Sequence, residues 1–217
     1  MKEGEEMPGT VWDNIYKTYL AGGPAWATLQ DDLHPCFVSF IEKSAFPHKH
    51  ALDIGCGAGK YLKYLQLKGF RTSGLDSSES AVEMTKDLLG DQGKIILADM
   101  YEYQYPSNTY DLIISHATLH HGMKKDVVTL LDKIFEALVK DGKIFLSLPS
   151  DDCIKNWAMM AKHETLEDGT CIPLCGPEKG LPHSFYAKEE VDRLFSRYVN
   201  LETEIDECGR WVIQGEK

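Results

Sequence analysis

The chain of 217 residues has no long apolar run and few basic residues. No segment approaches the roughly 18 consecutive apolar residues that a membrane-spanning helix needs, and residues 1–7 lack the apolar core of a secretory signal. Lys and Arg number 23 against 34 Asp and Glu, which gives a net charge of −11. Because so acidic a surface repels phosphate backbones and anionic lipid headgroups, we expect neither a nucleic acid nor a membrane as partner.

Cysteine is sparse, with six residues at widely separated positions. Scattered cysteines do not form the dense framework of a small secreted domain, so we expect reduced thiols and a cytoplasmic location. Cys171 and Cys175 stand in a C-x₃-C arrangement, which leaves binding of a soft ion open. Two thiols are too few for a tetrahedral zinc site, and we interpret both as ordinary thiols. The sequence therefore predicts no metal site, and it does not indicate an oligomeric state.

From residue 50 onward, short apolar runs alternate with stretches of helical periodicity. Because these runs are almost continuously apolar, they are typical of parallel strands covered on both faces. We expect parallel strands at 50–54, 71–76, 94–99, 110–116 and 143–148. Two further strands at 199–207 and 210–215, joined by a short link, predict an antiparallel hairpin. The expected fold is α/β and Rossmann-like: a seven-stranded sheet of five parallel strands plus a closing antiparallel hairpin, with helices on both faces.

Polar residues follow the predicted parallel strands where each one ends. They are Asp53, Asp76, Asp99, and Ser115 with His116. In an open parallel sheet these ends lie along one edge, where ligands bind. Packing alone gives little reason for a polar residue directly after an apolar strand, so we expect a binding site along this edge.

A glycine-rich turn, Gly55-Cys56-Gly57-Ala58-Gly59, follows the first strand and opens a helix. Glycines let the backbone turn sharply and let a ligand approach main-chain atoms closely. A dinucleotide fingerprint needs glycine at position 60, which holds Lys60, so an NAD-dependent oxidoreductase is disfavoured. A nucleoside-triphosphate loop needs glycine at 54 and Ser or Thr at 61, and Ile54 and Tyr61 exclude it.

Asp76 lies 17 residues beyond Gly59, at the end of the second strand. A carboxylate there is placed to accept hydrogen bonds from both hydroxyls of a ribose. A helix N-cap is the alternative role for Asp76, and solvent exposure at a strand end is the alternative for Asp99.

The segments 51–59, 74–78, 97–100 and 110–121 together resemble the class I S-adenosylmethionine (SAM)-dependent methyltransferases, and 138–147 resembles the next element of that family. The phrases at 119–121 and 176–186 are similar to its small-molecule branch. The resemblance implies transfer of a methyl group from SAM to a small-molecule acceptor, with S-adenosylhomocysteine as product. It leaves the acceptor and its reacting atom open: O, N, S or C.

The resemblance also implies site residues. Those expected to bind SAM are Asp53, Gly55, Cys56, Gly57, Asp76, Ser77, Asp99, Met100, Ser115 and His116, with Tyr16 and Trp26 closing over it. Core packing remains the alternative role for the two aromatic residues. Residues expected to line the acceptor pocket are His120, His121, His183 and Tyr186. His116 is the candidate general base, and a pocket wall is its alternative role.

We expect one methyltransferase domain over residues 1–217. Within it, 1–47 is a helical cap, 48–150 the SAM-binding core, 151–186 a substrate lid, and 187–217 the final helix and hairpin. A protein methyltransferase and a non-catalytic SAM-binding protein remain alternatives to transfer onto a small molecule.

Overall fold

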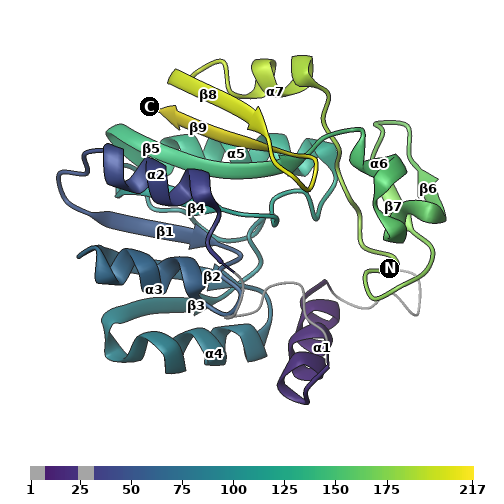
Figure 1. The fold of residues 1–217 in the computed structure, drawn as a ribbon, viewed down its shortest axis with the longest axis horizontal. Coiled ribbons are helices and arrows are strands. Elements are labelled where there is room, and N and C mark those ends of the chain that lie inside the picture. The colour runs from purple at the N-terminus through teal and green to yellow at the C-terminus, as the bar shows by residue number, and fades with distance from the viewer. Residues whose placement is uncertain (1–7, 24–31) are drawn as a thin grey trace.

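The computed structural model describes residues 8–23 and 32–217, and a seven-stranded sheet lies at its centre (Figure 1). The strand order is β3-β2-β1-β4-β5-β9-β8. Its strands are β1 (His50–Ile54), β2 (Arg71–Asp76), β3 (Gly93–Leu97), β4 (Tyr110–Ser115), β5 (Leu138–Pro149), β8 (Val199–Ile205) and β9 (Arg210–Glu216). The first five pair in parallel, whereas β9 runs antiparallel to both β5 and β8. The predicted fold class is confirmed.

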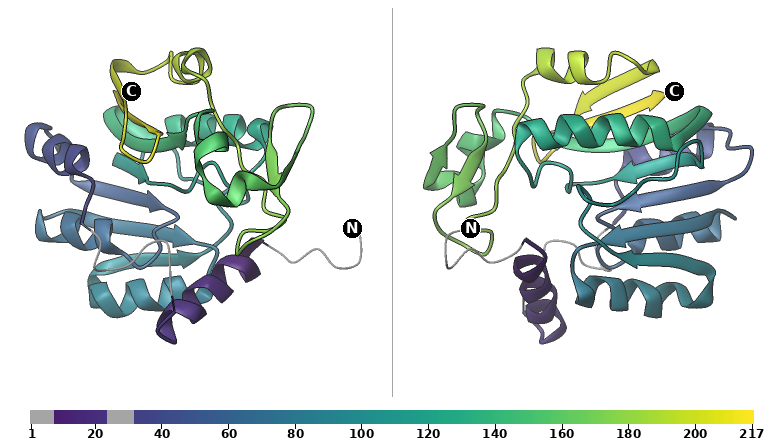
Figure 2. Two further views of the ribbon diagram at one scale, coloured as in Figure 1. Left: turned by 45° about the vertical axis from the view of Figure 1, so that its right-hand side comes forward. Right: turned by 180° about the vertical axis from the view of Figure 1, so that it is seen from behind.

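Helices cover both faces of this sheet (Figure 2). One face carries α2 (Pro35–Lys43), α3 (Lys60–Leu67) and α4 (Glu79–Leu89), and the other carries α5 (Lys124–Ala137) and α7 (Lys188–Leu194). Strand β4 shows why its sequence is continuously apolar: Leu112 and Ile114 pack in the cluster under α2 and α3, and Ile113 packs in the cluster under α5. Successive side chains of a strand point to opposite faces, so both faces require apolar residues.

The strand order reverses between β1 and β4, since the chain builds outward from β1 through β2 to β3 and then returns to β4 on the other side. In open α/β sheets, the crevice at such a switch point is the ligand-binding position. The glycine turn, which follows β1, therefore lies where the fold itself favours a ligand.

Two segments lie at the carboxyl ends of the parallel strands (Figures 1 and 2). One is α1 (Pro8–Leu20), and the other holds α6 (Cys153–Asn156), a 3₁₀ helix at Ala158–Ala161, and the hairpin of β6 (His163–Thr165) and β7 (Cys171–Pro173). Helix α1 begins at Pro8, and proline suits the first turn of a helix. Among the helices of the described residues, none is long and apolar enough to cross a membrane.

Three sequence expectations differ in detail from the structure. The substrate lid expected over 151–186 contains a two-stranded hairpin that was not predicted, in which Cys171–Pro173 pairs with His163–Thr165. Helix α2 falls within the expected cap yet packs its buried Phe37 and Ile41 on the sheet. Strand β5 begins at Leu138, not 143, and its register against β4 shifts after Tyr110.

Candidate functional site

A cavity of about 800 Å³ lies at the carboxyl ends of the parallel strands, beside α1 and the 151–186 insertion. This volume falls within the roughly 300–1,000 Å³ of small-molecule sites. Twelve of the residues predicted for the site line this cavity: Tyr16, Asp53, Gly55, Cys56, Gly57, Asp76, Ser77, Asp99, Met100, His116, His120 and His121.

Four predicted residues do not line the cavity or are not described. Ser115 is fully buried and its Oγ donates to the Ile54 carbonyl at 2.7 Å, so it ties β4 to β1 beneath the site. Tyr186 belongs to the core cluster under α5, and His183 is fully buried behind the lining residues. Trp26 lies outside the described residues.

The glycine turn is fixed against β2 by its backbone. The amides of Gly55 and Cys56 both donate to the Leu75 carbonyl, at 2.8 and 3.0 Å. Gly55 has a φ of +72°, and a Cβ added there would lie 2.2 Å from the Cγ2 of Thr118. Only glycine suits this position, because other residues rarely adopt a positive φ and because any side chain would collide with Thr118.

Two buried carboxyl groups face the cavity beside this turn. Asp76 accepts hydrogen bonds from the amides of Gly57 and Ser78, each at 2.9 Å. Burial raises the pKa of Asp76, and the backbone hydrogen bonds offset part of that rise. Burial and the charge of Asp76 raise the pKa of Asp53 well above its usual range. Within residues 8–23 and 32–217 no hydrogen bond reaches the Asp53 carboxyl, so it is free to accept one from a ligand.

Helix α1 closes one side of the cavity with Tyr16. This side chain packs against Ala58 and Ala81. Burial, and then the charge of Asp76, raise the pKa of the Tyr16 hydroxyl, so it remains a protonated donor at neutral pH.

An acidic residue anchors α1 at the N-terminus of α4. Asp13 Oδ1 accepts from the Ser80 amide at 2.8 Å and from the Ser78 hydroxyl at 3.1 Å. Burial raises the pKa of Asp13, but hydrogen bonds from Lys17, Ser80 and Ser78 outweigh it and lower the pKa to about 2. A carboxylate is stabilised there, because unpaired amides and the helix dipole favour negative charge.

The loop after β3 forms another side of the cavity, in addition to those formed by the glycine turn and α1. Asp99 Oδ1 accepts from the Tyr101 amide at 2.7 Å, and the Tyr101 hydroxyl donates to the Leu119 carbonyl at 3.0 Å. Tyr101 was not predicted as a site residue. The other lining residues with charged, amide, aromatic or thioether side chains that were not predicted as site residues from the sequence are Trp12, Lys60, Tyr61, Met123, Asp126, Asn156, Trp157, Glu178 and Arg210.

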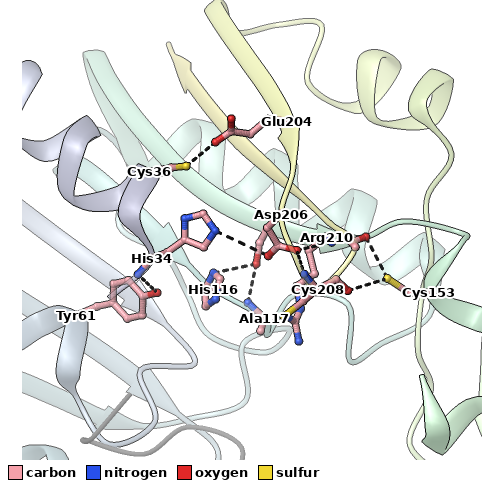
Figure 3. A network of polar contacts seen from close by, with 12 residues as sticks. His34, Cys36, Tyr61, His116, Ala117, Cys153, Glu204, Asp206, Cys208 and Arg210 are labelled. Atoms are coloured by element: carbon pink, nitrogen blue, oxygen red, sulfur yellow. Dashed lines mark hydrogen bonds and ion pairs between the residues drawn. The ribbon is translucent and has the colours of Figure 1, made fainter. Parts of the chain in front are cut away.

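His116 is half-buried and lies near His34, Asp206 and Arg210 (Figure 3). Its Nδ1 lies 3.2 Å from the Oγ of Ser147, which accepts from the Ala117 amide. Burial, followed by the charge of Arg210, lowers the pKa of His116 to about 3. Since a general base works best with a pKa near the working pH, this histidine is a weak proton acceptor at neutral pH.

Arg210 brings a cation to the same region from the start of β9. Its guanidinium lies 5.1 Å from the Trp157 ring, and its buried Nε has no hydrogen-bond partner within the described residues. Because β9 runs antiparallel to β5, its first residue lies at the carboxyl ends of the parallel strands. That register is the signal by which a sequence argument could have found Arg210.

Three of the four residues expected to line the acceptor pocket come together. The ligand atoms of His120, His121 and His183 lie within 4.8 Å of one another, and Glu178 is hydrogen-bonded to the last. Charge around the whole cavity is unbalanced: it is lined by the acids Asp53, Asp76, Asp99, Asp126 and Glu178 and by the cations Lys60 and Arg210. Even without Asp53, whose raised pKa favours its neutral form, the acids outnumber the cations four to two, and this excess favours a cationic ligand.

Comparison with known proteins adds independent findings. Residues 52–146 match the model of a family described as a methyltransferase domain. The chain is 30% identical over 154 residues to phosphoethanolamine N-methyltransferase of Plasmodium falciparum, covering 68% of this chain and 54% of that protein. It is 25% identical over 156 residues to the probable tRNA methyltransferase 9B of Bos taurus, covering 71% of this chain and 31% of that one.

Among solved structures, the PH0226 protein of Pyrococcus horikoshii matches with a TM-score of 0.73 at 16% identity, covering 92% of this chain and 98% of that one. At so low a sequence identity, this structural match shows that the two proteins share a fold and nothing more. The chain spans about half of the first of these two curated relatives and about a third of the second.

Proposed function

Because the chain belongs to the class I S-adenosylmethionine-dependent methyltransferases, we propose that it transfers a methyl group from SAM to a small-molecule acceptor, both held in the 800 Å³ cavity. One observation carries the proposal: the glycine turn and buried carboxyls of the family's motifs share a single cavity with the residues of the insertion. A donor and an acceptor bound in one enclosed space can be held in contact.

The residues at the β1 and β2 ends suit the cofactor. Asp76 would accept from the ribose hydroxyls, and Asp53, whose carboxyl lacks a hydrogen bond among the described residues, would accept from the amino group of the methionine part. Asp99, Met100 and Tyr16 would enclose the adenine side. The negative potential of the lining supports binding of a ligand that carries a sulfonium cation.

SAM supplies a methyl group already activated by the positive charge of its sulfur. The chain's task is then to align the acceptor and exclude water, which is worth several kcal/mol through proximity alone. We assign His116 to the cavity wall instead of to base catalysis, because a histidine with a pKa of about 3 takes up a proton poorly at neutral pH.

The acceptor would lie at the other end, between Tyr101, Trp157 and Arg210. The unpartnered Nε of Arg210 is a donor for an oxygen-bearing group of the acceptor. In this division residues 48–150 would hold most of the cofactor, and residues 151–186 would cover the acceptor. The six free cysteines support a reducing, cytoplasmic location.

A tRNA acceptor is the second candidate, because relatives named as tRNA methyltransferases match this chain. The net charge of −11 and the five acids around the cavity oppose it, since phosphate backbones bind to basic surfaces.

A screen with methyl-labelled SAM distinguishes a small-molecule acceptor from a tRNA acceptor. The purified chain is incubated with small-metabolite pools and, in parallel, with total tRNA, and labelled products are identified by mass. We expect label in a small metabolite that requires intact enzyme, and none in tRNA. Label in tRNA alone would refute the proposed acceptor class, and no transfer to any acceptor would favour a protein that only binds SAM.

A further inference from the structure

Three histidines and one glutamate form a compact cluster at the insertion end of the cavity. His120 and His121 follow β4, whereas Glu178 and His183 come from the 151–186 segment. The Nε2 of His183 lies 2.6 Å from Glu178 Oε2, and the Nδ1 of His121 lies 3.8 Å from the same oxygen. No metal site was predicted from the sequence, because only the thiols of Cys171 and Cys175 were considered as ligands.

The hydrogen bonds of His183 leave one of its ring nitrogens facing a carboxylate oxygen with no proton assigned between them. Its Nδ1 lies 2.9 Å from the Leu181 carbonyl, which only accepts, so Nδ1 carries a proton. In a neutral ring Nε2 would then present a lone pair to the Glu178 oxygen, which is also an acceptor. At 2.6 Å only a proton fits between the two atoms, and a metal ion bound by both would replace that proton once the side chains move apart.

Two further nitrogens of the cluster are unsatisfied. The Nδ1 atoms of His120 and His121 are buried and have no hydrogen-bond partner among the described residues. His120 is 2% exposed. Buried polar atoms normally find partners, and each one left without a partner costs free energy, so the cluster lacks a group that would satisfy it.

We propose that His120, His121, His183 and Glu178 bind one divalent transition-metal ion of the zinc type. Neutral imidazoles with one carboxylate are the donors that such ions take in proteins. Ligands about 2.1 Å from zinc lie about 3.4 Å apart at tetrahedral angles, so nitrogens within 4.8 Å of one another reach that arrangement by side-chain shifts of about 1 Å.

The surroundings resemble those of protein metal sites. The Leu181 carbonyl orients His183, as an outer-shell acceptor commonly does for a histidine ligand. The rings of Trp12, Trp157 and Phe185 lie 4.6, 5.8 and 6.4 Å from those of His121, His120 and His183, and form an apolar wall. Such a wall limits water and strengthens the attraction between the ion and its ligands.

The ion would be accessible from the cavity, since His120, His121 and Glu178 line it. An oxygen, nitrogen or sulfur atom of the methyl acceptor could then bind the ion directly. This role rests on the proposed function, but the binding of the ion does not.

The test is calorimetric titration of the chelator-treated full chain with Zn²⁺, followed by titration with Co²⁺, whose visible absorption reports its ligands. We expect one Zn²⁺ per chain and cobalt bands without thiolate charge transfer. Because outer-shell changes already cost 10- to 100-fold in metal affinity, His121→Ala should weaken Zn²⁺ binding at least about 100-fold. His48→Ala, at an exposed histidine outside the cluster, should leave it unchanged.

Folding and cofactor binding are followed in the same samples. Thermal unfolding shows whether His121→Ala folds, and if it does not, Glu178→Gln replaces it because this change keeps the side-chain size. Asp76→Asn should retain Zn²⁺ binding while losing SAM affinity, so failure of the cofactor assignment is distinguishable from failure of the metal site. A wild-type dissociation constant for Zn²⁺ above about 0.1 mM, or equal Zn²⁺ affinity in folded variants of the cluster, would show that the cation is a proton shared by His183 and Glu178.

Discussion

Replacing Asp76 with asparagine separates its two roles, in the fold and in cofactor binding. Its carboxylate accepts from the amides of Gly57 and Ser78 at 2.9 Å each. Asparagine keeps one acceptor oxygen but turns an NH₂ group toward the other amide. An unsatisfied buried donor costs about 1–3 kcal/mol, so Asp76→Asn should lower the free energy of unfolding by about that amount.

The loss of SAM affinity has a separate cause. A hydrogen bond to a charged group contributes about 1.5–3 kcal/mol, which corresponds to about 10- to 150-fold in the dissociation constant. Calorimetric titration with SAM and denaturant unfolding, run on the same preparations, measure the two effects. Asp91→Asn is the matched control, because Asp91 is exposed on the turn after α4. Wild-type SAM affinity in a folded Asp76→Asn variant would refute the ribose assignment.

Three more outcomes are expected. His116→Ala should lower kcat by less than about 100-fold, and a loss beyond about 10⁴-fold with normal SAM binding would instead make it an essential base. Gly122→Ala places a Cβ 1.9 Å from the Tyr101 hydroxyl oxygen, so kcat/KM for the acceptor should fall by up to about 100-fold; unchanged kinetics would exclude Tyr101 from the acceptor pocket. The pKa of Asp13 is lowered to about 2, so its carboxylate stabilises the fold above its unfolded pKa and that contribution disappears as pH falls from about 4 to 2. Thermal unfolding across this range should therefore drop more in the wild type than in Asp13→Asn, and parallel curves would contradict the anchoring role.

The sheet could be predicted because its strands are buried on both faces. Continuous apolar runs mark each one, and the positions of β1 (50–54) and β2 (71–76) coincide with the expected ranges. The glycine turn and the acids at strand ends were found for the same reason: they interrupt an apolar pattern. Periodicity did not reveal β6 and β7, since each has three residues and forms only by pairing with the other.

The acceptor end of the cavity could be predicted only in part. His120 and His121 were expected there from the family resemblance of residues 119–121, but Glu178 was not named as a site residue and stands in a loop whose sequence carries no period. Its contact with His183 depends on how that loop folds back over the strand ends. Ser115 shows the opposite error: it stands at the right position in the sequence, but its side chain turns to the Ile54 carbonyl, below the cavity.

Equilibrium titration of the wild-type chain with SAM, S-adenosylhomocysteine and NAD tests the central claim most directly. Calorimetry should give one site per chain for SAM and for S-adenosylhomocysteine, each competing with the other, and no heat from NAD. NAD should not bind, because Lys60 stands where a dinucleotide fingerprint has glycine. Binding of NAD in competition with SAM, or no binding of SAM at all, would contradict the assignment of the cavity to a methyl-donor cofactor.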